Sequence, residues 1–116
     1  MKRRFFLIAA VLLFLLSLTA HAASTAYDAN PSLSFNGTTA YCAVLCRGDK
    51  TTDSISAILT LYQGNTEIDS WSNSGSFCVP VSGSCGVVSG VTYRLKLTWS
   101  VNGVSQPDIE VTNTCP

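Results

Sequence analysis

The most informative segment of the chain for its fold is Tyr93-Arg94-Leu95-Lys96-Leu97-Thr98-Trp99-Ser100-Val101. Apolar and polar residues alternate through it without a break, beginning and ending on an apolar residue. Successive side chains of a β-strand point to opposite faces. The pattern therefore predicts a strand with one face in a core and the other in water, and it places Trp99 in the core set.

Tyr93 opens this strand, directly after Gly90-Val91-Thr92. A tyrosine at the start of such a strand can fold onto the edge of a β-sandwich and hydrogen-bond the nearby backbone, as in a tyrosine corner. The alternative is an ordinary aromatic residue that faces the core.

Six further segments have a period of two or are rich in Val, Ile and Thr, with turn-forming residues between them. They span residues 32–35, 39–46, 55–62, 66–71, 77–81 and 109–111. After residue 22 no stretch has helical spacing, so no helical crossover is available and the strands should be antiparallel. We predict an all-β fold, an antiparallel immunoglobulin-like β-sandwich of about seven strands, with a small closed barrel as the alternative.

The N-terminus has the layout of a secretory signal peptide. A basic start is followed by fourteen almost wholly apolar residues, 5–18, and by the cleavage pattern Ala20-His21-Ala22. That run is shorter than the roughly 20 residues that cross a bilayer. We predict a signal peptide over 1–22, cut after Ala22 or Ala23, a flexible lead-in over 23–31 and a secreted β-sandwich domain over 32–116, with no membrane attachment after cleavage.

Cleavage of the signal peptide would change the net charge and the histidine content of the protein. The whole chain has a formal net charge of zero, but residues 23–116 hold four basic and seven acidic side chains, which gives −3. An acidic balance argues against nucleic-acid binding. His21 is the only histidine and leaves with the signal peptide, which excludes Ser-His-Asp and Cys-His catalysis. We expect no enzyme and no cofactor, and we interpret loop acids such as Asp53 as solvated surface.

All five cysteines follow the cleavage site, and export to an oxidising compartment favours disulfides. If 39–46 and 77–81 are antiparallel neighbours, Cys46 would face Cys78, and Cys42 would bond Cys85. Cys115 would then be the unpaired thiol on a mobile tail, unless it takes Cys85 instead. The protein is accordingly expected as a monomer or as a dimer through Cys115. No Cys-x-x-Cys pair is present, so no metal site is expected.

Two surface features suggest binding. Arg47-Gly48-Asp49 is the tripeptide of integrin-binding loops, and it is equally a common charged surface turn. Trp71 and Tyr62 would form an exposed aromatic patch for a sugar, or else Trp71 only covers the edge of a sheet.

Three segments carry a resemblance to known proteins. They are Ser56-Ala57-Ile58-Leu59-Thr60-Leu61, Ile68-Asp69-Ser70-Trp71-Ser72 and Ser89-Gly90-Val91-Thr92-Tyr93-Arg94-Leu95-Lys96. In their order and strand pattern they are similar to a group of small, functionally uncharacterised secreted proteins of Gram-positive-type bacteria. The resemblance covers about residues 32–112 and implies a single β-sandwich domain without catalytic residues. The five cysteines depart from that group, which is generally poor in cysteine.

Together these observations predict an extracellular, disulfide-stabilised β-sandwich that is a binding or structural module. Its partner would be an extracellular protein or glycan. The alternative is a small secreted effector or inhibitor.

Overall fold

The computed structural model of the chain describes residues 27–116. The predicted signal peptide and its cleavage site lie outside the described residues. The described part consists of strands and turns, without a helix. It accordingly contains no helix long and apolar enough to cross a membrane.

Seven strands occupy the segments in which the sequence predicted them. These are β2 (Ser32–Asn36), β3 (Thr39–Arg47), β4 (Ser54–Gln63), β5 (Thr66–Ser76), β6 (Cys78–Gly86), β7 (Thr92–Val101) and β9 (Ile109–Thr114). Two short strands were not predicted, β1 (Asp28–Ala29) and β8 (Val104–Ser105). β5 and β6 also run beyond their predicted ends. Their second halves are rich in Ser and Gly and show no apolar alternation, so the sequence pattern does not reveal them.

The segment 23–31, which we expect to be a flexible lead-in, contains β1 in its described part. Asp28 pairs with Arg47 of β3, and Ala29 pairs with Cys46. The side chain of Ala29 is buried. A strand of two residues is too short to show an alternation of apolar and polar side chains, so only its pairing with β3 reveals it.

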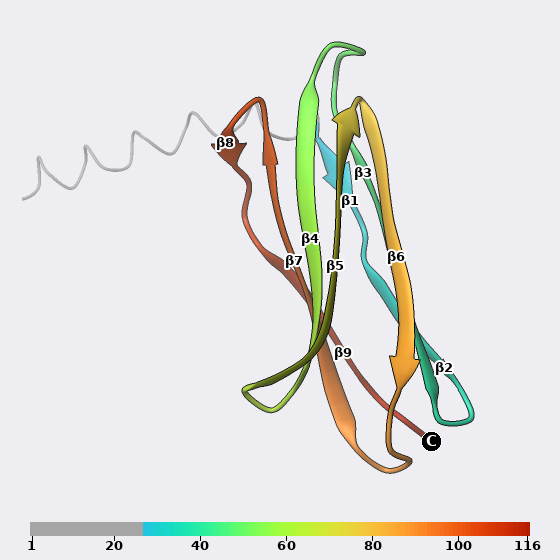
Figure 1. Ribbon diagram of the computed structural model, residues 1–116. Helices are drawn as coiled ribbons and strands as arrows, with labels where there is room; N and C mark the ends of the chain where they lie inside the picture. The colour runs from blue at the N-terminus through green and yellow to red at the C-terminus, as the bar shows by residue number, and fades with distance from the viewer. Residues whose placement is uncertain (1–26) are drawn as a thin grey trace, which may run out of the picture.

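The strands form two antiparallel sheets (Figure 1). In the first sheet β3 is central, with β6 along one edge and β1 and β2 along the other. In the second sheet the order is β5-β4-β7, and β8 and β9 both pair with the outer edge of β7. The prediction of an all-β fold with antiparallel sheets is confirmed.

The core lies between the two sheets and is supplied by alternate positions of the long strands. The apolar set of β7 that the alternation predicted is buried, and Trp99 is the most exposed of the five at 6%. β4 contributes the neighbouring row of the same sheet, and β3 and β6 contribute the facing layer. The principal members are Tyr93, Leu95, Leu97, Trp99 and Val101; Ile55, Ala57, Leu59 and Leu61; Ala40, Cys42, Val44 and Cys46; and Val79 and Val81.

Tyr93 closes one end of this core. Its side chain is 2% exposed, and its ring centroid lies 6.1 Å from that of Phe35 in β2. The hydroxyl oxygen of Tyr93 accepts a hydrogen bond of 2.8 Å from the backbone N–H of Val88, in the loop between β6 and β7. The predicted hydrogen bond between the hydroxyl of this tyrosine and nearby backbone is confirmed.

Two contacts join the sheets at the edge where β5 meets β6. The indole of Trp71 in β5 lies directly on Gly83 in β6, so that a Cβ atom at Gly83 would overlap ring atoms Cε2 and Nε1. Two positions further along β5, the side-chain amide of Asn73 donates a 2.8 Å hydrogen bond to the carbonyl oxygen of Pro80. Gly83 is therefore the residue that lets Trp71 close this edge.

Candidate binding site

Trp71 and Tyr62 do not form the expected aromatic patch, because they lie on opposite faces of the second sheet. Trp71 pairs with the buried Leu59 and faces the first sheet. Tyr62 follows an irregularity in the β4–β5 register and pairs with Arg94, a residue of the outer face. The guanidinium carbon of Arg94 lies 4.4 Å from the centre of the Tyr62 ring and covers it. Trp71 thus takes the alternative role of closing a sheet edge.

The tripeptide Arg47-Gly48-Asp49 is not displayed at the tip of a loop. Arg47 is the last residue of β3 and has a pairing partner on each side. Gly48 is buried, and its N–H donates a 2.7 Å hydrogen bond to the carbonyl oxygen of Phe77. A Cβ atom at Gly48 would lie 2.9 Å from Cβ of Asp53, so packing alone accounts for the glycine.

Asp53 organises the loop between β3 and β4 and corrects its interpretation as solvated surface. The residue is 6% exposed. Its Oδ2 accepts hydrogen bonds of 2.9 Å from the backbone N–H groups of Asp49 and Lys50, and its Oδ1 accepts one of 3.0 Å from the amide of Asn102. Asn102 in turn exchanges hydrogen bonds with the backbone of Ser54. Asp53 therefore ties this loop to the turn between β7 and β8.

We predict that this loop makes the fold sensitive to acid. The hydrogen bond from the Lys50 backbone, followed by that from Asn102, holds the pKa of Asp53 below its usual value. A lowered folded-state pKa stabilises the fold above the unfolded-state value of about 3.9, and this contribution disappears as the pH falls through the folded-state pKa. In urea unfolding from pH 7 to pH 3, Asp53→Asn should be less stable than wild type at pH 7 and should show a flatter pH dependence.

The control for this experiment is Asp49→Asn, which removes an exposed carboxylate from the same loop. It should follow the wild-type curve. If the Asp53→Asn curve ran parallel to wild type at every pH, Asp53 would not be the source of the acid sensitivity.

The predicted bond between Cys46 and Cys78 is wrong by one residue of register. Cys46 pairs with Val79, and Cys78 pairs with Arg47. A shift of one residue moves a side chain to the other face of a sheet. Cys46 is accordingly buried in the core, whereas Cys78 is exposed on the outer face.

Cys42 and Cys85 share the inner face, but they are diagonal rather than direct partners, since Cys42 pairs with Gly83 and Cys85 with Ala40. Burial, with smaller effects from Cys85 and Asp69, raises the pKa of Cys42 to about 12. All five cysteines are free thiols in the structure. The Cys42–Cys85 bond stays a prediction, and its formation would need β3 and β6 to move, because diagonal Cα atoms lie about 7–8 Å apart.

Cys115 is not on a mobile tail. Its side chain is fully buried, and its thiol lies 3.3 Å from the carbonyl oxygen of Gly37. Its backbone N–H donates to Val91, and its carbonyl oxygen accepts from Gly90. The dimer through Cys115 stays a prediction, and its formation would require the thiol to leave this enclosure.

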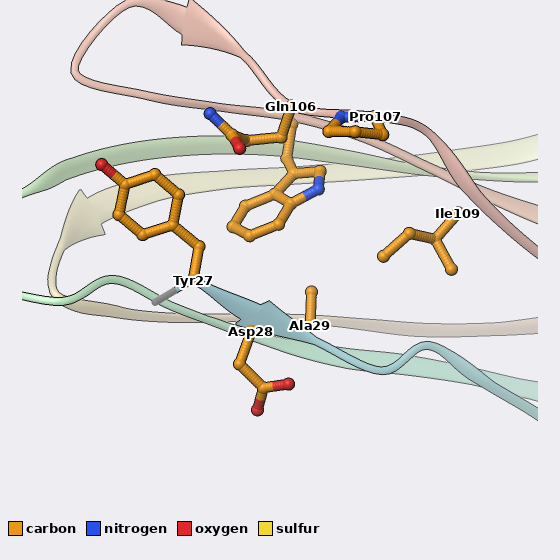
Figure 2. Close-up of a pocket in the computed structure, with 7 residues that line it drawn as sticks. Tyr27, Asp28, Ala29, Gln106, Pro107 and Ile109 are labelled. Atoms are coloured by element: carbon orange, nitrogen blue, oxygen red, sulfur yellow. The ribbon is translucent and has the colours of Figure 1, made fainter. Parts of the chain in front are cut away.

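A pocket of about 240 Å³ opens at the edge of the sandwich opposite the Trp71 contact. On one side it is formed by the start of the described chain and β1, and on the other by the segment from β8 to β9. Trp99 of β7 also lines it. Figure 2 shows Tyr27 and Ala29 pointing toward Gln106, Pro107 and Ile109. None of the residues predicted to bind a partner lines this pocket.

The pocket combines an aromatic and aliphatic lining with few polar groups. Asp28 is its only charged lining residue, and in Figure 2 the carboxylate of Asp28 points away from the other labelled side chains. The Nε1 atom of Trp99 is buried and has no hydrogen-bond acceptor among the residues that the structure describes. Gln106 is held by its backbone N–H, which donates to the Trp99 carbonyl oxygen, and by its side-chain amide, which donates to Val104. Its side-chain carbonyl oxygen remains an acceptor for a ligand.

Comparisons with protein-family models and with curated proteins found no match to this chain. The pocket and its chemistry are therefore the basis for a functional assignment.

Proposed function

We propose that this protein is a secreted, non-catalytic binding module with an immunoglobulin-like fold, and that its partner occupies the pocket lined by Trp99. The strand order supports the fold. If β2 to β7 are taken as strands A, B, C, C′, E and F, and β9 as G, then A, B and E share one sheet while C′, C, F and G share the other. Immunoglobulin-like sandwiches divide their strands in this way. The hydrogen bond of Tyr93 near the start of strand F agrees with it.

The pocket is the observation that carries the proposed function. Ligand sites are concave and largely apolar, with a few polar groups that orient the ligand. The lining by Tyr27, Trp99, Gln106 and Pro107 fits that description. It offers neither a nucleophile with an adjacent base nor a pair of carboxylates, so its chemistry favours binding over catalysis. The layout of residues 1–22 supports export.

We predict that the protein, purified from the medium of cells that express the full chain, binds an extracellular protein or glycan through this pocket. Immobilised cell-wall polysaccharides and surface proteins would be tested with wild type, Tyr27→Ala and Tyr41→Ala. Tyr41 is the matched control because it is an exposed tyrosine of the first sheet outside the pocket. Tyr27→Ala should weaken binding by at least about tenfold, since buried aromatic anchors dominate binding energy. Tyr41→Ala should bind like wild type.

Equal binding by all three proteins would reject the pocket as the binding site. Failure of wild type to bind any material would contradict a binding module, and growth inhibition of other cells by the same preparation would then favour the effector alternative.

A further inference from the structure

We propose that Asn73 and Asn113 close the two open edges of the sandwich and keep each edge from pairing with a second copy of this chain. The inference does not depend on what the Trp99 pocket binds. Asn73 lies in β5, at the edge where β5 meets β6. Asn113 lies in β9, at the other edge, where β9 meets β2. We call these two side chains the edge bridges.

Asn73 uses both ends of its amide at the first edge. Its nitrogen donates a 2.8 Å hydrogen bond to the carbonyl oxygen of Pro80 in β6, and its Oδ1 accepts one of 2.9 Å from the backbone N–H of Ser74. One side chain thus binds a donor of one sheet and an acceptor of the other. A further strand that added to β5 at this point would have to break both hydrogen bonds.

Asn113 repeats this arrangement at the second edge. Its nitrogen donates a 3.0 Å hydrogen bond to the carbonyl oxygen of Leu33 in β2, and its Oδ1 accepts one of 3.0 Å from the backbone N–H of Thr114. β2 pairs only with β3, and β9 pairs only with β7, so both are edge strands of their sheets. The same two-ended contact therefore joins the sheets at both edges.

The backbone N–H groups that the edge bridges bind point away from the rest of their sheet. In the closely spaced type of antiparallel pair, the two side chains are near each other and the N–H groups point away from the partner strand. The hydroxyls of the paired residues Thr114 and Thr92 lie 2.8 Å apart. Those of the paired residues Ser70 and Thr60 lie 3.3 Å apart. Ser74 has the orientation of Ser70, because it lies four positions further along β5.

The second half of β5 depends on its edge bridge, because it lacks the usual protection of an edge strand. Edge strands present unpaired N–H and carbonyl groups, and charged side chains, proline or bulges commonly keep a second chain away from them. Residues 71–76 contain neither a charged residue nor a proline, and the shift in the β4–β5 register lies before them. The acidic start of the strand differs, since Oδ1 of Asp69 accepts a hydrogen bond from the N–H of Ser70.

A second copy of β5 fits this edge. Two identical strands that pair antiparallel across a two-fold axis present the same surface to each other. If such a pair were centred on Ser72, the carboxylates of Glu67 and Asp69 would lie beside the uncharged residues 75–77 of the other copy. No like charges would then oppose the pairing. The N–H of Ser72 also points outward and has no acceptor among the described residues, so it is available to the second copy.

The test compares the self-association of wild type, Asn73→Ala and Asn113→Ala by sedimentation from micromolar to near-millimolar concentration, with a reductant present to exclude disulfides. Wild type should remain a monomer. Each variant should associate at least about tenfold more strongly, because a backbone donor and a carbonyl acceptor become free to pair. The control is Asn65→Ala, at an exposed asparagine in the turn between β4 and β5. It should remain a monomer like wild type.

Amide hydrogen exchange, corrected for intrinsic rates, shows whether the edge of β5 is the interface. In monomeric wild type the N–H of Ser74 should exchange about fivefold more slowly than that of Ser72, since only Ser74 has an acceptor. In dilute, monomeric Asn73→Ala this difference should disappear. When the variant associates at high concentration, the N–H of Ser72 should become protected because it pairs with the second copy.

A lysine at the edge should reverse the effect of Asn73→Ala. Ser72 is exposed, and Ser72→Lys in the Asn73→Ala background would place two like charges opposite each other in the paired strands. This double variant should return to the monomer. Ala43→Lys in the same background adds an equal charge at an exposed position of β3, the central strand of the first sheet. It should leave the association in place.

The proposal is overturned at either edge if the corresponding asparagine variant is as monomeric as wild type, or if wild type itself associates through β5. Association of Asn73→Ala without protection of the Ser72 N–H would also overturn it, as would equal effects of Ser72→Lys and Ala43→Lys. If Asn73→Ala does not fold, the exchange rates of wild type decide. Equal protection of Ser72 and Ser74 would then show that Asn73 does not hold the edge.

Discussion

Tyr93→Ala is expected to lower the free energy of unfolding by about 3–5 kcal/mol, the range for removal of a large buried aromatic side chain. Tyr93 is 2% exposed, contacts Phe35 and is hydrogen-bonded to Val88. A domain of this size is typically stable by roughly 5–13 kcal/mol at 0.05–0.15 kcal/mol per residue. The variant should therefore lose roughly a quarter or more of its stability, which urea unfolding followed by tryptophan fluorescence would measure.

Tyr93→Phe separates the two contributions of this residue. It keeps the ring contact with Phe35 and removes only the acceptor of the Val88 N–H. The expected loss is about 1 kcal/mol, the net value of a typical hydrogen bond. Tyr41→Ala, at an exposed tyrosine, should stay within about 0.5 kcal/mol of wild type. A Tyr93→Phe variant as unstable as Tyr93→Ala would show that the hydroxyl, rather than the ring, maintains this end of the core.

Gly83→Val is expected to destabilise the protein by about 1–3 kcal/mol, as overpacking of a filled site does. The new side chain would occupy the position of the Trp71 indole, so the ring must leave the edge between β5 and β6. In a β-strand valine is otherwise preferred over glycine. The sign of the effect should therefore reverse in a Trp71→Ala background, where Gly83→Val should be neutral or stabilising.

A double-mutant cycle of Trp71→Ala and Gly83→Val measures this coupling directly. The four unfolding free energies should give a coupling of at least about 1 kcal/mol, in the range for residues in contact. If Gly83→Val cost the same with and without Trp71, the glycine would be required for a reason other than the indole.

The placement of the strands could be read from the sequence because the signal is local. The alternation in 93–101 predicted β7, the burial of Trp99 and the position of Tyr93, since burial of one face demands a period of two. Where a strand lacks that pattern, as in the second half of β5 and in β1, its extent depends on the neighbour it pairs with. The sequence pattern therefore predicts β5 with too early an end and does not predict β1.

The register between strands, and the sheet face on which some side chains lie, could not be inferred from the sequence in the same way. The pairing of β3 with β6 differs by one residue from the pairing assumed for Cys46 and Cys78, and that single step puts the two thiols on opposite faces. The expected patch of Tyr62 and Trp71 fails because of Trp71: Tyr62 lies on the outer face, as the alternation of β4 predicts, whereas Trp71 pairs with the buried Leu59 and faces the first sheet. Both cases depend on how two strands pair, which the pattern within one strand does not specify.

The alternating apolar residues were enough to predict antiparallel strands that bury one face, because that requirement acts within each strand. The roles of the remaining residues depend on how the two sheets pack together. This packing buried Asp53 under three hydrogen bonds, enclosed Cys115 and placed Trp71 on Gly83. It also formed the Trp99 pocket from two segments that are at least 70 positions apart in the chain, residues 27–29 and 99–109. No pattern within either segment specifies the other, so the candidate site exists only where the edges of the two sheets meet.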